Sequence, residues 1–97
     1  MRDYLVFMHS DTRHPEAVDD WEPYVAALRE RGMFAGGSAL APPSCFQKDA
    51  AATTPPRVLT GYIRIRACDL ADARTCLAGN PVYEAGGTVE ICELIED

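Results

Sequence analysis

His9 is the titratable side chain of this sequence that is best placed to do chemistry. It ends the short apolar run Tyr4–His9. An imidazole at the end of a strand, beside a cleft, can act as a general acid or base near neutral pH. The alternative is a structural histidine held by hydrogen bonds. The other histidine, His14, precedes Pro15 in a polar segment, and we expect it to be solvated.

The other side chains that could bind a ligand or take part in catalysis are supported by weaker sequence patterns. Trp21 and Tyr24 could form an aromatic wall for a small organic ligand, although their helical spacing is equally typical of a core. Ser38 has no adjacent histidine and acid that would make it a nucleophile. The pairs Gly36-Gly37 and Gly86-Gly87 lack the lysine of a phosphate-binding loop. We therefore expect no cofactor.

Metal and disulfide chemistry find little support in the spacing. His9, Asp11 and His14 flank one turn and are the best set of ligands available, but the pattern matches no known metal motif. The four cysteines are scattered without a CxxC pair, and we expect free, small buried thiols in a reducing compartment: Cys45, Cys68, Cys76 and Cys92.

Composition limits the class of protein. The 97 residues predict a single domain over 1–97, and 47% hydrophobic with 25% charged residues is typical of a folded soluble protein. The net charge of −6 argues against a nucleic acid or an anionic membrane as partner. The opening run Tyr4–Met8 is too short for a signal peptide, and no other run has membrane-spanning length. A cytoplasmic location is expected.

Four strands and two helices must position these groups. Asp20 is expected to cap the first helix, which ends at Gly32, and Asp69 to cap the second, which Gly79-Asn80-Pro81 stops. The paired glycines 36–37 predict a bulge or a close approach of another backbone or a ligand, and plain packing is an equal alternative. The predicted strands are Tyr4–His9, Met33–Leu40, Val58–Ala67 and Thr88–Ile95, and the stretch 49–56 is predicted to be a mobile loop.

The order βαββαβ predicts an α+β fold, a ferredoxin-like four-stranded antiparallel sheet with both helices on one face. The first strand is apolar on both faces, so the face without helices needs a cover. A second copy is the economical candidate, and pairing two such sheets makes a dimeric α+β barrel. Tyr62, Arg64 and Glu90 would then lie near the enclosed cleft, either as an Arg64–Glu90 ion pair or facing a ligand.

The sequence resembles the YCII-related proteins, in particular the branch named for its DGPF motif. The resemblance spans nearly the whole chain and rests on the apolar opening strand, the helix before Gly32, and the segments Gly37-Ser38-Ala39-Leu40, Leu59-Thr60-Gly61-Tyr62-Ile63, Asn80-Pro81 and Gly87-Thr88-Val89-Glu90-Ile91. It implies a dimeric α+β barrel of ferredoxin-like topology. Related domains are often linked with sigma-factor systems or fused to other domains.

Two marks of the family are missing. The DGPF motif falls on Asp49-Ala50-Ala51-Ala52, so that only its acid remains, and the histidine that another branch carries in the first helix falls on Trp21. The resemblance leaves Asp49 as a group that could orient a ligand or form a hydrogen-bonded pair with His9. The leading hypothesis is a homodimeric small-molecule-binding protein, of lyase or isomerase type if catalytic, in which His9 and Asp49 carry proton transfer.

In the same hypothesis Trp21, Tyr62 and Arg64 shape and charge the pocket. Because Arg64 and Arg66 share one strand face, the ligand could be a small anion. The competing hypothesis, which the loss of the motif favours, is a non-catalytic regulatory or protein-interaction module.

Overall fold

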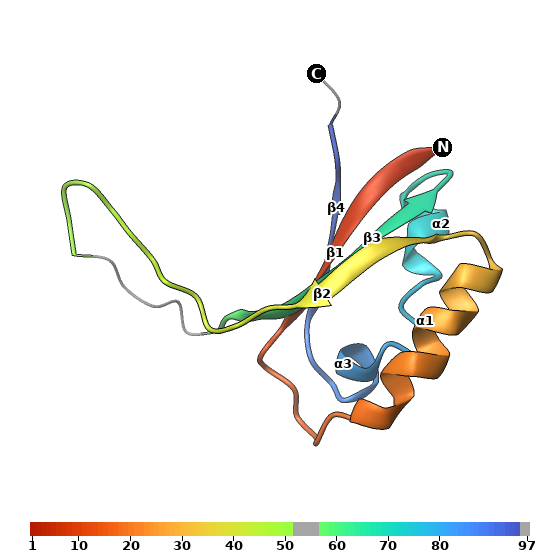
Figure 1. Ribbon diagram of the computed structural model, residues 1–97, viewed down its shortest axis with the longest axis horizontal. Coiled ribbons are helices and arrows are strands. Elements are labelled where there is room, and N and C mark those ends of the chain that lie inside the picture. Colours follow the sequence, from red (N-terminus) through yellow and green to blue (C-terminus); the bar gives the residue numbers. More distant parts are fainter. Residues whose placement is uncertain (52–56, 96–97) are drawn as a thin grey trace.

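The computed structural model describes residues 1–51 and 57–95, and in these the chain forms a four-stranded antiparallel sheet and three α-helices. The strands lie in the order β2-β3-β1-β4, and Figure 1 shows the helices on one side of the sheet. The α+β class is confirmed, and the strand order is compatible with a ferredoxin-like fold. The strands are β1 (Arg2–His9), β2 (Phe34–Ala39), β3 (Leu59–Ala67) and β4 (Val89–Glu93); the helices are α1 (Trp21–Glu30), α2 (Leu70–Arg74) and α3 (Pro81–Glu84).

Alternation along β1 and β3 separates the two faces of the sheet. Tyr4, Val6 and Met8 of β1 are buried against the helices, whereas Leu5, Phe7 and His9 point to the other side and are only partly buried. In β3 the buried residues are Gly61, Ile63, Ile65 and Ala67. We call the side of the sheet that carries Asp3, Leu5, Phe7 and His9 the open face, because the helices pack on the opposite side.

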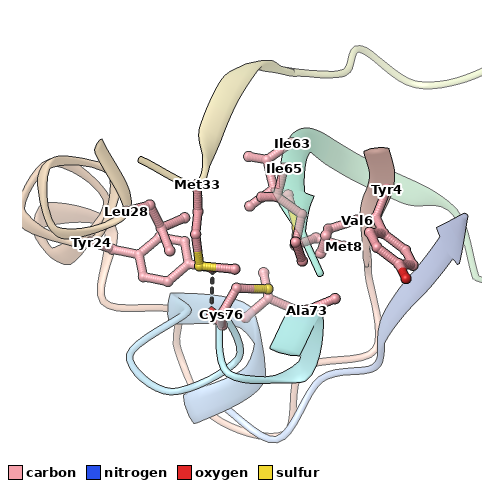
Figure 2. Close-up of a cluster of buried hydrophobic side chains, with 12 residues drawn as sticks. Tyr4, Val6, Met8, Tyr24, Leu28, Met33, Ile63, Ile65, Ala73 and Cys76 are labelled. Atoms are coloured by element: carbon pink, nitrogen blue, oxygen red, sulfur yellow. Dashed lines mark hydrogen bonds between the residues drawn. The ribbon is translucent and has the colours of Figure 1, made fainter. Parts of the chain in front are cut away.

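The core between helices and sheet contains one buried polar link. Figure 2 shows Tyr24 and Leu28 of α1 facing Cys76, with the Tyr24 hydroxyl donating to the Cys76 backbone carbonyl at 2.6 Å. Burial raises the pKa of Tyr24, so the phenol stays a donor. Asn80 is completely buried; its side-chain oxygen accepts from the backbone amides of Val82 and Tyr83 at 3.0 and 3.1 Å.

The helix ends agree with the sequence prediction at Asp69 but differ from it at Asp20, at the end of α2 and at the start of α3. Asp20 lies in a 3-10 turn, η1 (Val18–Asp20), with helical backbone angles, and its side chain makes no capping hydrogen bond. Asp69 does cap α2, because its carboxylate accepts from the Asp72 amide at 2.8 Å. The second helix ends at Arg74, and Asn80-Pro81, predicted to be a stop, begins the additional helix α3, since proline is favoured in a first turn.

Strand β2 contains the predicted irregularity. Its register against β3 shifts between Phe34 and Gly37, and Gly36 adopts a φ of 122°. A Cβ atom at Gly37 would lie 2.6 Å from the backbone oxygen of Tyr62, so only glycine allows this approach. β2 and β4 are both shorter than predicted, β4 ending at Glu93 with Ile95 exposed.

The other structural expectations have mixed outcomes. The four cysteines are free, but only Cys76 is buried, Cys92 is partly buried, and the prediction of buried thiols is wrong for Cys45 and Cys68. The predicted mobile loop 49–56 falls outside the described residues from 52 onward. Within the described residues, every helix is too short or too polar to cross a bilayer.

Candidate functional site

His9 meets an acidic side chain at the edge of the open face. Its Nε2 atom lies 2.8 Å from Oε1 of Glu90, a residue of β4 that the register places opposite Phe7. The His9 side chain is 13% exposed and that of Glu90 is 47% exposed. The second carboxylate oxygen of Glu90 contacts the Cys92 thiol at 3.5 Å. A ligand on the open face can therefore reach Glu90, with His9 lying behind it.

The surroundings of His9 define which nitrogen carries the proton. The Nδ1 atom is buried and has no hydrogen-bond partner among the described residues. Because a carboxylate only accepts, Nε2 donates to Glu90, and in the neutral ring Nδ1 then keeps its lone pair. The hydrogen bonds from His9 and Cys92 lower the pKa of Glu90, which fixes this carboxylate in its ionised form near neutral pH.

A second network anchors the segment after β1 to the start of β4. Both Asp11 carboxylate oxygens accept from Thr88, Oδ1 from its amide at 2.8 Å and Oδ2 from its hydroxyl at 2.6 Å. Arg57 adds an ion pair to Asp11 at 3.0 Å. These bonds, those from Thr88 foremost, lower the pKa of Asp11 to about 2. The network holds the strand ends that carry His9 and Glu90 and leaves Asp11 committed to structure.

The opposite end of the open face is positively charged. Asp3 pairs with Arg64 at 3.2 Å and with Arg66 at 3.4 Å, and both arginines are about half exposed or more. Within one chain, Arg64 of β3 lies opposite Leu5 and reaches along β1 to Asp3, while an Arg64–Glu90 ion pair across an interface between two copies stays a prediction. Among residues 1–51 and 57–95, these two guanidinium groups share one carboxylate, so one positive charge remains unbalanced there.

The register joins these two ends through an apolar middle. Phe7 lies opposite Tyr62 on one side and opposite Glu90 on the other, and Leu5 lies opposite Arg64 and Cys92. Leu5, Phe7 and Tyr62 are partly buried although no helix covers them. The open face therefore runs from an arginine pair, across an apolar strip, to an ionised carboxylate.

The predicted site residues do not gather in one place. Asp49 is exposed in the segment that follows β2, and the structure shows no hydrogen bond or ion pair between it and His9. Trp21 and Tyr62 line a pocket of about 340 Å³ between α1, β2 and β3, but Arg64 is not among its lining residues and pairs with Asp3 instead. His9, Tyr62 and Arg64 share the open face, whereas Trp21 belongs to the helix side.

The sequence alone did not reveal the partner of His9. The alternation along β4 predicts on which face of the sheet Glu90 lies, but not which side chain of the next strand lies beside it. The sequence therefore suggested Arg64 as the partner of Glu90 and not His9. With β4 paired to β1, Glu90 lies opposite Phe7, which is two residues from His9 along β1, so its side chain can reach His9. Asp11, considered only as a metal ligand, turned out to bind Thr88 and Arg57. The chain matches no known protein-family model, and no curated protein sequence matches it either.

Proposed function

We propose that this protein is a YCII-related homodimer that binds a small anionic organic molecule between the open faces of two copies, in a dimeric α+β barrel. The observation that carries the proposal is the His9–Glu90 pair at 2.8 Å on the same face as Arg64 and Arg66. Such a ligand would meet positive charge at one end and an oriented carboxylate at the other.

The apolar strip supports the pairing of two copies. Leu5, Phe7 and Tyr62 form a continuous apolar middle on the sheet face opposite the helices. A small domain gains needed burial when a second copy covers such a strip, and an isologous contact would bring both copies of the strip together. Charged groups at the two ends of the strip would then form the rim of the cleft.

The charge distribution supports an anionic ligand. Arg64 is 47% and Arg66 62% exposed in their side chains, and in the part of the chain that the structure describes they share one carboxylate, which leaves a net positive charge. A guanidinium binds a carboxylate or phosphate through paired N–H donors. The overall charge of −6 makes this patch a local exception on an acidic protein.

We infer that Glu90 carries the proton transfer in this proposal and that His9 has a positioning role, which the following contacts support. The Glu90 carboxylate is exposed enough to meet a ligand, and the Nε2–H bond of His9 orients it. Its lowered pKa makes it a weak base, so the proton it takes must be acidic, as on a carbon beside a carbonyl. Returning that proton to another carbon gives an isomerase, and expelling a leaving group gives a lyase.

A panel of small carboxylates and organic phosphates tests the proposal, with binding followed by the thermal shift of the protein. Arg64→Gln should weaken binding of any hit by about tenfold or more, as expected for loss of a charged contact. Glu90→Gln should leave binding largely intact but stop solvent deuterium from entering the ligand carbon, as seen by NMR. Glu22→Gln, at an exposed position of α1, is the matched control. Deuterium entry that survives Glu90→Gln would overturn the acid–base role.

Dimerisation has a separate test. Sedimentation of the wild type at tens of micromolar should show a dimer, and Phe7→Lys on the open face should weaken its self-association, since a charge inside an apolar contact is costly. Ala26→Lys, at an exposed position of α1 on the helix side of the sheet, serves as control for the added charge. A wild type that sediments as a monomer would contradict the pairing.

The non-catalytic interaction module remains the second candidate, because one observation favours it. His9 Nδ1 is buried and Asp49 lies apart from His9, so the predicted His–Asp pair is not assembled within one chain. A wild type that binds its ligand tightly, with no deuterium entering that ligand under any condition, would favour this second function.

A further inference from the structure

The segment after β2 carries an unusually exposed aromatic side chain. Residues 40–51, which we call the arm, leave the body of the protein at the end of β2 and project away from it (Figure 1). Phe46 in the arm is 91% exposed, and Leu40 at its base is 40% exposed. Pro42-Pro43 favours an extended backbone just before it. Because aromatic residues are enriched in the cores of protein–protein interfaces, Phe46 is a candidate anchor for a contact with another chain.

The molecule also contains an apolar pocket that no side chain of the described residues fills. It has a volume of about 340 Å³, within the range of pockets that enclose organic groups. Its walls are mainly apolar and come from β1, α1, β2 and β3; they include Met8, Trp21, Val25, Phe34 and Ile63. Gly37 and Gly61 contribute no side chains to fill it.

One acidic group lies at this pocket, and it is already engaged. The Glu16 carboxylate accepts a hydrogen bond from the Trp21 indole N–H at 2.7 Å. The indole N–H engages one oxygen of this carboxylate, and the other lining side chains are mainly apolar, so an entering side chain meets mostly apolar surface. The pocket therefore fits a purely apolar aromatic ring.

The arm and the pocket are adjacent at the base of the arm and separate at its tip. Ser38 and Ala39 line the pocket, and the arm begins at the next residue, Leu40. From Leu40 to Phe46 an extended chain spans roughly 20 Å, which carries the ring away from its own pocket. If two copies are related by a twofold axis and their arms lie antiparallel, the tip of each arm lies at the base of the other copy's arm.

We propose that Phe46 inserts into the pocket between α1, β2 and β3 of a second copy, so that two chains exchange arms. The contact is isologous, because each copy supplies one ring and one pocket, and it closes after two copies. It needs a second copy but not the pairing of the open faces or any ligand. It therefore stands or falls separately from the function proposed above.

The chain offers a direct reporter for this contact. Trp21 is the single tryptophan, so its indole N–H gives one NMR resonance from the pocket wall. Cys45, next to Phe46, is exposed and can carry a nitroxide spin label in a Cys68→Ser, Cys92→Ser background, in which Cys76 stays buried. Spin-labelled unenriched chains are mixed with ¹⁵N-enriched chains that carry no label, so only contacts between copies are seen.

Exchange of arms predicts that the Trp21 indole resonance broadens in this mixture. Phe46→Ser in the labelled chain should abolish the broadening, whereas Gln47→Ser, at an exposed neighbouring position, should preserve it. In a second sample, every chain carries both the spin label and ¹⁵N. Broadening in that sample but not in the mixture would show the arm folding onto its own pocket and overturn the proposal. No broadening in the mixture or in the second sample would overturn it as well.

A second measurement separates arm exchange from occupation of the pocket by a small molecule. If Phe46 fills the pocket, the wild type should bind the apolar dye anilinonaphthalene sulfonate weakly, and Phe46→Ser should bind it more strongly with a change in Trp21 fluorescence. Equal dye binding by the two proteins would show a pocket open in solution and refute the insertion. Phe46→Ser should also weaken self-association by about fivefold or more, as the loss of a buried aromatic anchor does.

Discussion

Replacing Asn80 by alanine is the most informative test of how the core is held together. Asn80 is fully buried, and its side-chain oxygen accepts from the first two free amides of α3, those of Val82 and Tyr83. Its side-chain nitrogen also lies 3.4 Å from the Tyr24 hydroxyl. Alanine removes all three contacts at once.

The expected loss can be assembled from these contacts. A helix cap contributes about 1 kcal/mol. A buried amide without a partner costs about 1–3 kcal/mol, and the Val82 amide is buried while that of Tyr83 is partly buried. Asn80→Ala should therefore lower the free energy of unfolding by roughly 2–4 kcal/mol, a large share of the ~5–15 kcal/mol of a typical domain.

Asp69 provides the matched comparison, because it caps α2 through one exposed amide, that of Asp72. Water replaces an exposed cap, so Asp69→Ala should cost only about 1 kcal/mol. Both variants are to be unfolded in urea at one fixed protein concentration and followed by far-UV circular dichroism. If Asn80→Ala lost no more stability than Asp69→Ala, the reasoning from burial would be refuted.

Three further predictions follow from the described contacts. Gly37→Ala should lower the stability by about 1–3 kcal/mol, because its methyl group would meet a backbone oxygen at 2.6 Å; an unchanged unfolding midpoint in urea would contradict this. Asp11 has its pKa lowered to about 2 by Thr88, so its stabilising contribution is complete above about pH 4 and is lost as the pH falls toward 2. The stability difference between wild type and Asp11→Asn should shrink over that interval in acid titrations, and a constant difference would argue against the bonds. Cys45 should react with a thiol reagent in the native protein and Cys76 only after unfolding, as mass spectrometry of the modified chain can show.

Much of the fold follows from local sequence patterns. The alternation in β3 correctly separates Ile63 and Ile65 from Tyr62 and Arg64, because a period of two has only two faces to choose from. The strand order also follows, since βαββαβ with short connections leaves few arrangements. The bulge near Gly37 was visible because paired glycines in a strand signal a close approach.

The pairing of side chains was harder to predict. His9 could be ranked first from its residue type and its place at a strand end, but its partner Glu90 lies 81 positions away. Choosing between Glu90 and Asp49 needs the register of β4 against β1, which no local pattern contains. The start of α3 was missed for another reason: Asn80-Pro81 can either follow one helix or begin the next, and only the packing of Asn80 decides.

The irregular backbone of β2 has a consequence for how chains of this protein can aggregate. β2 is an edge strand, and a regular edge would offer an uninterrupted row of amides and carbonyls to a strand from another molecule. The register shift and the φ of 122° at Gly36 break that row in the middle. At the other edge β4 is only five residues long. Both borders of the sheet are thus poor templates for open-ended growth into fibrils, a hazard that exposed edge strands bring to a small β-rich chain.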